Sequence, residues 1–211
     1  MTHLSHGEGR LEVICGPMFS GKTEELLRRV RRAQIAKQPT VVFKPATDTR
    51  WDANAVRSHD ANESPSVMVR SSAEIGAWMA GQPRHIPVVA IDEAQFFDNE
   101  LPRLCAKLAD EGHRVIAAGL DLDFTGEPFG CMLELLARAE EVAKLNAVCL
   151  ETGRPAHFSH RIAGGTATVE VGEKDRYIPL TRQAFVAARA VRKGLSSGRE
   201  ETEAIDGADR P

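Results

Sequence analysis

The segment from residue 16 to residue 23 constrains the fold more than any other part of the sequence. It reads Gly-Pro-Met-Phe-Ser-Gly-Lys-Thr and fits the pattern G-x-x-x-x-G-K-[ST] at every fixed position. An apolar run at residues 11–15 precedes it, and helix-forming residues at 23–37 follow it. Glycines let successive backbone N–H groups turn toward phosphate oxygens, and the N-terminal end of the helix adds a positive dipole. We therefore expect a triphosphate-binding loop, with Lys22 on the β- and γ-phosphates and Thr23 on Mg²⁺.

Strand and helix patterns alternate along the first two thirds of the chain. Apolar runs at residues 11–15, 40–43, 87–91 and 114–119 predict buried strands, and residues 23–37, 71–79, 100–111 and 132–143 have helical character. Residues 44–65 are polar and rich in turn formers, which predicts a loop. Ser72 is the expected N-cap of the second helix, and Trp78 is expected to face the core. This alternation predicts an α/β fold with a parallel sheet covered by helices on both faces.

The character of the sequence changes after Asn146. Residues 147–185 are rich in Gly, Thr and turn formers, and the alternation at 166–171 predicts a hairpin strand. Residues 186–193 are compatible with a short helix, and residues 194–211 are polar enough to be disordered. We expect a flexible arm at 1–10, a nucleotide-binding domain at 11–146, a small lobe at 147–193 and a disordered tail at 194–211.

Two carboxylates, Asp92 and Glu93, follow the apolar run that ends at Ile91. An aspartate at the end of such a strand lies beside the phosphate loop and helps to hold Mg²⁺. Glu93 is then available to remove a proton from a phosphoryl acceptor. An alcohol as acceptor would make the protein a kinase and water would make it an ATPase, and the spacing of the residues does not decide between them.

Composition excludes several classes of protein. The net charge is -3, whereas proteins that bind nucleic-acid phosphates usually carry a basic excess. No apolar stretch reaches the ~18 residues that span a membrane, and the polar N-terminus does not resemble a signal peptide. The four cysteines (Cys15, Cys105, Cys131 and Cys149) are widely spaced, which favours a reduced, cytoplasmic setting. We expect neither nucleic acid nor membrane as a partner.

Five motifs in order extend the similarity well beyond the phosphate loop. They are GPMFSGKTEELLRR, KPATDTR, IDEAQFF, AAGLDLDFTGEPFG and AVCLETGRPAHFSHR. Together, over residues 11–185, they resemble the type II thymidine kinases, a tetrameric family of bacteria and of animal cytosol. The resemblance implies a cytoplasmic homotetramer with a P-loop core that converts ATP and thymidine, with Mg²⁺, to ADP and thymidine 5′-monophosphate for nucleoside salvage and DNA synthesis.

Family roles carry over to the matching residues of this sequence. Glu93 matches the base that accepts the 5′-hydroxyl proton, and Thr23 and Asp92 match the Mg²⁺ side of the site. The resemblance implies ATP contacts from Gly16, Pro17, Met18, Phe19, Ser20, Gly21, Lys22, Thr23, Asp48, Thr49, Arg50, Asp92, Glu93, Ala94 and Gln95. It implies thymidine contacts from Met18, Phe96, Leu120, Phe124, Phe129, Ser159, Thr168, Val169, Glu170, Val171, Gly172 and Tyr177. Simple packing remains an alternative for Phe124 and Phe129, as does a structural hydroxyl for Tyr177.

The sequence departs from the family at its zinc site. Members usually carry two pairs of zinc ligands, but the corresponding positions here are Cys149 and Thr152, then Thr181 and Ala184. His157 and His160 add two ligand types to Cys149 without a fourth, whereas a structural zinc is four-coordinate. We expect a zinc-ribbon-like lobe that has lost its zinc and is held by packing.

Two other functions fit part of the sequence. A P-loop ATPase such as a helicase fits the phosphate loop and the Asp-Glu-Ala-Gln run, but the chain is short and lacks a basic track for nucleic acid. A nucleotide-binding module without turnover fits the altered lobe. Retention of Lys22, Thr23, Asp92 and Glu93 argues against such a module.

Overall fold

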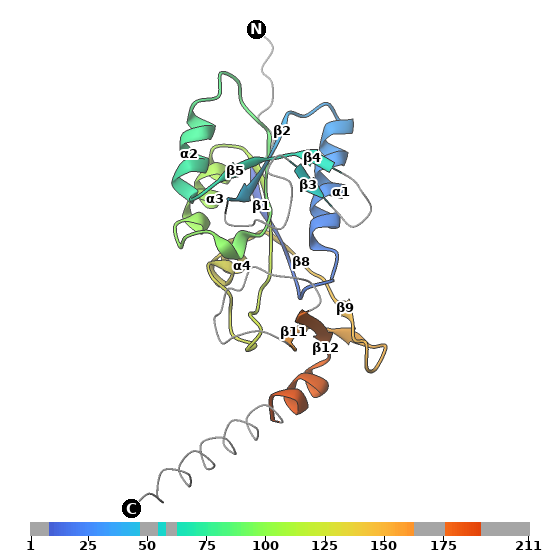
Figure 1. The fold of residues 1–211 in the computed structure, drawn as a ribbon. Coiled ribbons are helices and arrows are strands. Elements are labelled where there is room, and N and C mark those ends of the chain that lie inside the picture. Colours follow the sequence, from blue (N-terminus) through green and yellow to red (C-terminus); the bar gives the residue numbers. More distant parts are fainter. Residues whose placement is uncertain (1–8, 47–54, 58–62, 163–175, 191–211) are drawn as a thin grey trace, which may run out of the picture.

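The computed structural model describes residues 9–46, 55–57, 63–162 and 176–190. Its centre is a six-stranded sheet in which every neighbouring pair is parallel (Figure 1). In spatial order the strands are β5 (Val67–Val69), β2 (Thr40–Pro45), β6 (Val88–Ile91), β7 (Arg114–Gly119), β1 (Arg10–Cys15) and β8 (Glu141–Lys144). The predicted α/β class is confirmed. In a parallel sheet the carboxyl ends of all strands meet at one edge, which is where ligands bind in this architecture.

Helices cover both faces of the sheet, as predicted (Figure 1). Helix α1 (Lys22–Ile35) packs on one face through Leu26, Leu27, Val30 and Ala33. The opposite face is covered by α2 (Ser72–Ala80), α3 (Leu101–Asp110) and α4 (Met132–Arg138). Successive strand residues point to opposite faces, so the near-continuous apolar runs of the sequence supply both cores at once.

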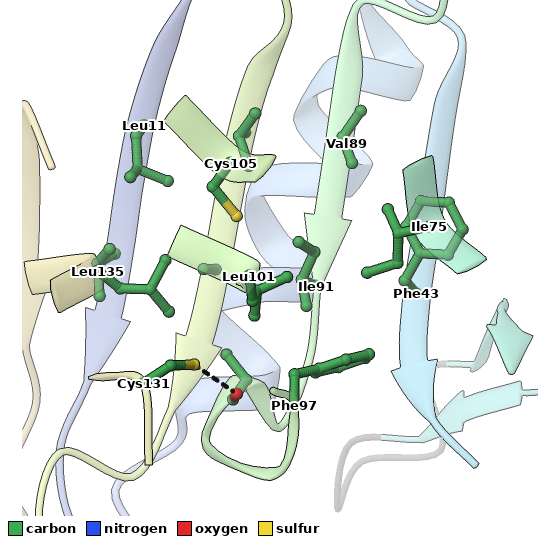
Figure 2. Packing of buried hydrophobic residues seen from close by; sticks show 14 of the residues in the cluster. Leu11, Phe43, Ile75, Val89, Ile91, Phe97, Leu101, Cys105, Cys131 and Leu135 are labelled. Atoms are coloured by element: carbon green, nitrogen blue, oxygen red, sulfur yellow. Dashed lines mark hydrogen bonds between the residues drawn. The ribbon is translucent and has the colours of Figure 1, made fainter. Parts of the chain in front are cut away.

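Figure 2 shows the core on the side of α2, α3 and α4. Leu11, Phe43, Val89 and Ile91 of the strands meet Ile75, Leu101, Cys105 and Leu135 of the helices. Trp78 packs edge-on against Phe43 with ring centroids 5.2 Å apart, which confirms that it faces the core. Cys131 Sγ donates to the carbonyl oxygen of Ala94 at 3.3 Å, so the start of α4 is tied to the segment after β6.

The predicted helix at 132–143 is too long. Helix α4 ends at Arg138, and Glu141–Lys144 form the edge strand β8 parallel to β1. Backbone and side chain of Glu140 both bind Leu11, at 3.0 Å and 2.7 Å, and so draw the chain alongside β1. Strand β8 is mostly exposed on both faces, so its polar sequence does not differ from that of a helix surface.

Two further predictions are corrected. Ser71, not Ser72, is the N-cap of α2, and its hydroxyl accepts a hydrogen bond from the Glu74 N–H. The Ser72 hydroxyl instead donates to Asp98 at 2.6 Å. The predicted loop at 44–65 contains an antiparallel pair, β3 (Ala55–Arg57) and β4 (Glu63–Pro65).

The small lobe has its own core. It contains β9 (Ala147–Val148), β10 (Pro155–Ala156), β11 (Phe158–Arg161), β12 (Tyr177–Leu180) and a helix at residues 182–190. The predicted helix at 186–193 therefore begins four residues earlier than expected. Phe158 stacks on Phe185 with centroids 4.5 Å apart. The expected strand at 166–171, the tail at 194–211 and most of the expected arm lie outside the described residues.

A buried carboxylate joins the sheet to α1. Glu12 points to the α1 side of β1, is fully buried, and accepts hydrogen bonds from Arg29 of α1 at 2.6 Å and from Arg114 of β7 at 2.6 and 2.9 Å. Arg10 adds a third contact at 2.7 Å. Burial alone would raise the pKa of Glu12, but the hydrogen bonds from Arg114 and Arg29 outweigh it and lower the pKa to about 2.

We predict that Glu12→Gln lowers the free energy of unfolding by about 3 kcal/mol at pH 7, because several arginines lose one shared partner. A depressed pKa contributes stability above the unfolded value of 4.5, and that contribution disappears as the pH falls toward 2. Urea unfolding at pH 7 and pH 3 should therefore show the difference between the two proteins shrinking in acid. Arg103→Gln, at an exposed ion pair, serves as the control and should change little. Equal urea midpoints for Glu12→Gln and the parent protein at pH 7 would contradict the prediction.

Candidate active site

The phosphate loop lies between β1 and α1, as predicted. Gly16 and Gly21 have backbone φ angles of 140° and 81°, which residues that carry a side chain rarely adopt. A Cβ on Gly16 would also lie 2.4 Å from the Leu145 carbonyl oxygen. Gly21 is the N-cap of α1, so the positive end of the helix faces the loop. The loop can therefore surround an anion with N–H groups.

The Lys22 side chain folds back toward the backbone of the phosphate loop. Its Nζ and the Ser20 hydroxyl both donate to the Pro17 carbonyl oxygen at 2.8 Å. Desolvation lowers the pKa of Lys22, while the nearby Glu93 and Asp92 carboxylates act in the opposite direction. A phosphate oxygen would be a stronger, charged acceptor for the same ammonium group.

Thr23 and Asp92 lie together at the end of β6. The Thr23 hydroxyl is 3.3 Å from both carboxylate oxygens of Asp92. Asp92 is buried, and burial, followed by repulsion from Glu93, raises its pKa to about 7. A hydroxyl and a carboxylate at this spacing are oxygen donors of the kind that Mg²⁺ prefers. The two residues predicted on the Mg²⁺ side of the site are thus neighbours.

Glu93 is held in an unusual backbone conformation. Its φ and ψ are 52° and 44°, the left-handed region, which costs a non-glycine residue about 1 kcal/mol or more. It begins the short helix η1 (Ala94–Phe96), and the Gln95 amide donates to its Oε2 at 2.6 Å. The other end of that amide accepts from the Leu120 N–H at 3.0 Å. Gln95 therefore fixes the Glu93 carboxylate relative to the end of β7.

Two glycines make room for Gln95. A Cβ on Gly130 would lie 2.3 Å from the Gln95 carbonyl oxygen, and one on Gly119 would lie 2.7 Å from its Oε1. Gly130 also has a φ of 54°. Both glycines belong to the quoted AAGLDLDFTGEPFG motif, but sequence reasoning assigned them no role because their partner lies far away in the chain.

The remaining predicted residues lie around the same edge of the sheet. Phe96 and Phe129 meet edge to face with centroids 5.7 Å apart, and the Met18 N–H donates to the Ser159 hydroxyl at 2.8 Å. The aromatic residues predicted to contact thymidine are partly exposed, and they are Phe96, Phe124, Phe129 and Tyr177. The core residues Phe43 and Phe97, in contrast, are buried. Leu120 is also partly exposed. The predicted Asp48, Thr49, Arg50, Thr168, Val169, Glu170, Val171 and Gly172 lie outside the described residues.

Three contacts at this edge were not predicted. Lys144 at the end of β8 pairs with Asp121 at 2.7 Å, and this hydrogen bond raises the pKa of Lys144. The Arg161 guanidinium lies 3.8 Å from the centroid of the Phe124 ring and also donates to the Tyr177 hydroxyl. These contacts join residues that are far apart in the sequence, which no local pattern reveals.

Comparison with known proteins shows the family of this chain. A model of the thymidine kinase family matches residues 9–185. The chain belongs to the thymidine kinase family. It is 50% identical over 181 residues to a thymidine kinase of Bacteroides thetaiotaomicron, covering 86% of this chain and 89% of that protein. It is 53% identical over 202 residues to a thymidine kinase of Deinococcus deserti, covering 90% and 100%.

One of the solved structures that the chain matches has only low similarity to it. Domain III of the Thermotoga maritima replication initiation protein DnaA has a TM-score of 0.39 at 17% identity, over 67% of this chain and 57% of that chain. Within the described ranges of this thymidine kinase family member, no helix has both the length and the apolar character needed to cross a bilayer.

The lobe of this thymidine kinase family member does not fit the zinc site that the resemblance implies. Cys149 is buried in the lobe core, and its thiol hydrogen-bonds with Thr152 and with the backbone of Thr181. The Thr181 hydroxyl accepts from the Ala184 N–H at 3.3 Å. The described residues contain no group of three potential metal ligands. Hydrogen bonds and a small apolar core thus occupy the positions expected for metal ligands.

We predict that Gly130→Ala destabilises the protein by about 2 kcal/mol, because the new Cβ meets backbone and the φ is positive. Gly153→Ala is the matched control. Its φ is also positive, at 66°, but nothing lies within 4 Å of the added Cβ. It should therefore show only the conformational cost, about 1 kcal/mol, in urea unfolding. Equal losses in the two variants would show that the contact with Gln95 does not matter.

Proposed function

We propose that the protein is an ATP-dependent thymidine kinase that transfers the γ-phosphoryl group of ATP to the 5′-hydroxyl of thymidine. The family match over residues 9–185 carries this proposal, since it covers both the sheet and the lobe. The site geometry supports the proposal in two ways. The site contains a phosphate loop, and it contains two carboxylates, the buried Asp92 and the Glu93 that Gln95 orients. We also propose that the enzyme works as a homotetramer in the cytoplasm, as the resemblance implies.

The phosphate loop is the proposed ATP site. Its N–H groups and the N-terminus of α1 would receive the phosphates, and Lys22 would exchange its contact with the Pro17 carbonyl for a phosphate oxygen. Asp48, Thr49 and Arg50 remain predicted contacts near the transferred group. Ala94 and Gln95 also remain predicted ATP contacts, although the buried Gln95 side chain is already engaged with Glu93 and Leu120.

Thr23 and Asp92 would hold Mg²⁺, since they bring a hydroxyl and a carboxylate together beside the loop. Bound Mg²⁺ would offset negative charge on the phosphates. The protein's own contribution is to keep these oxygens buried and oriented. The raised pKa of Asp92 means that a proton must leave this carboxyl before a cation can bind at or below neutral pH.

Glu93 is the proposed general base. It would accept the proton of the thymidine 5′-hydroxyl as that oxygen bonds to the γ-phosphorus and the bond to ADP breaks. The Gln95 amide donates a hydrogen bond to the Glu93 carboxylate and so orients it. The left-handed backbone conformation of Glu93 turns the chain away from the direction of β6. Met18, Phe96, Leu120, Phe124, Phe129, Ser159, residues 168–172 and Tyr177 are the proposed thymidine contacts.

Glu93→Gln should reduce thymidine-dependent ADP release by about 10²- to 10⁴-fold, because the amide cannot accept the proton. ADP release from Mg²⁺–ATP with and without thymidine measures this. Glu127→Gln, at an exposed carboxylate on the loop after β7, should retain full activity. Equal ADP release without thymidine would instead indicate an ATPase. Bound ATP without any turnover would indicate a nucleotide-binding module, and either result would refute the kinase proposal.

Mg²⁺–ATP binding should release protons at neutral pH. Asp92 has a pKa of about 7, so it is mostly protonated below pH 7 and charged above it, and cation binding should strengthen as the pH rises through 7. Calorimetry in two buffers of different ionisation enthalpy should detect proton release at pH 7. The release should be absent in Asp92→Asn. A parent protein that releases the same number of protons as this variant would contradict the assignment.

A further inference from the structure

One face of β11 contacts the nucleotide-binding core at two points. Ser159 and Arg161 are two residues apart and therefore point to the same side of the strand, and both are buried. Ser159 accepts the hydrogen bond from Met18 in the phosphate loop. Arg161 lies over Phe124 of the loop that follows β7. This strand thus connects the lobe to both loops of the site.

The Arg161 guanidinium contacts Phe124 and Tyr177. The Phe124 ring centroid lies 3.8 Å from its Cζ, which is close for a cation stacked on an aromatic face. The Tyr177 hydroxyl oxygen lies 2.9 Å from Nε and 2.7 Å from Nη2. Tyr177 is directly opposite Arg161 in the antiparallel β11–β12 pair, so the backbone keeps this contact in register. Arg161 is only 3% exposed, so little water competes for it.

This geometry determines whether the Tyr177 hydroxyl donates or accepts its remaining hydrogen bond. A phenol oxygen can accept two hydrogen bonds and donate one. Two Arg161 N–H groups supply the accepted bonds, so the hydroxyl hydrogen of Tyr177 must point to a different acceptor. Arginine carries no acceptor of its own, which excludes the reverse arrangement. A molecule that contacts this hydroxyl would therefore meet a donor.

We propose that Arg161 is a positioning residue for the nucleoside: it holds the Phe124 ring and makes Tyr177 a hydrogen-bond donor to an oxygen of the nucleoside. This inference rests on the proposed function, in which Phe124 and Tyr177 contact thymidine. The arginine acts through these two side chains and does not touch the reacting atoms. Its contacts with Phe124 and Tyr177 place it beside two predicted thymidine contacts, so we expect its loss to affect the acceptor more than ATP.

Arg161→Met tests the proposal through steady-state kinetics. The KM for thymidine should rise about tenfold or more, since an oriented donor and an ordered ring are lost. The KM for ATP should change less than about twofold. Arg161→Lys keeps the charge without the planar fork and should not restore the thymidine KM. Arg182→Met is the control, because this exposed arginine lies over Phe158 in the same lobe, with its Cζ 4.9 Å from the ring centroid, and both KM values should stay unchanged.

A spectroscopic measurement tests the contact without relying on turnover. Tyr177 is the only tyrosine in the chain, so the Raman doublet of the tyrosine ring reports on this residue alone. The intensity ratio of the doublet differs between a phenol that accepts hydrogen bonds and one that only donates. The parent protein should show a strongly accepting phenol, and Arg161→Lys should shift the ratio toward the donor form. A donor-only phenol in the parent protein overturns the proposal even if every variant fails to fold.

The kinetic outcomes separate this inference from the proposed function. Parent protein that binds ATP but shows no thymidine-dependent turnover refutes the kinase proposal, while the Raman result still decides the Arg161 contact. Parent protein with normal turnover, together with an Arg161→Met variant of unchanged thymidine KM, refutes the positioning role. Equal rises in both KM values would also refute it, because they would indicate a general loss of lobe structure.

Discussion

The two hydrogen bonds of the Gln95 amide determine the arrangement of the candidate site. One reaches the Glu93 carboxylate after β6 and the other reaches the Leu120 N–H after β7. Because the side chain is buried, loss of either partner would leave a polar group without water to replace it. Gly119 leaves room for the amide oxygen, and Gly130 leaves room for the backbone carbonyl of Gln95. The carboxylate proposed as the base is therefore part of a rigid unit.

The charged groups of this protein are distributed differently at the two ends of the parallel strands. Toward the amino end of β1, Glu12 is satisfied by arginines and its pKa is low. Beyond the carboxyl ends of β6 and β1, burial raises the pKa of Asp92 and lowers that of Lys22. The first arrangement stabilises the attachment of α1 to the sheet. The second leaves charges that a polyanion and a cation could satisfy, as expected of a binding site.

Much of the fold could be predicted from the sequence, because the apolar runs that form the central strands also lie next to recognisable loop motifs. The phosphate loop and the Asp92–Glu93 pair were located by local pattern alone. The edge strand β8 was missed, since its exposure gives it the composition of a helix surface, and only its pairing with β1 in the folded protein reveals it as a strand. The role of Ser72 was misassigned because Asp98, its partner, lies 26 residues away. Arg161 carries no local signal at all, since Phe124 and Tyr177 become its neighbours only after folding.

The hydrogen bond from the Met18 N–H to the Ser159 hydroxyl joins the nucleotide-binding core to the small lobe. Met18 belongs to the loop that would surround the phosphates, and Ser159 lies on the same face of β11 as Arg161. A shift of that loop on taking up a triphosphate would either carry β11 along or break this bond. In either case, occupancy of the proposed ATP site would alter the strand that holds Arg161. Any resulting change in thymidine affinity would be reciprocal, because thermodynamic linkage applies to both ligands.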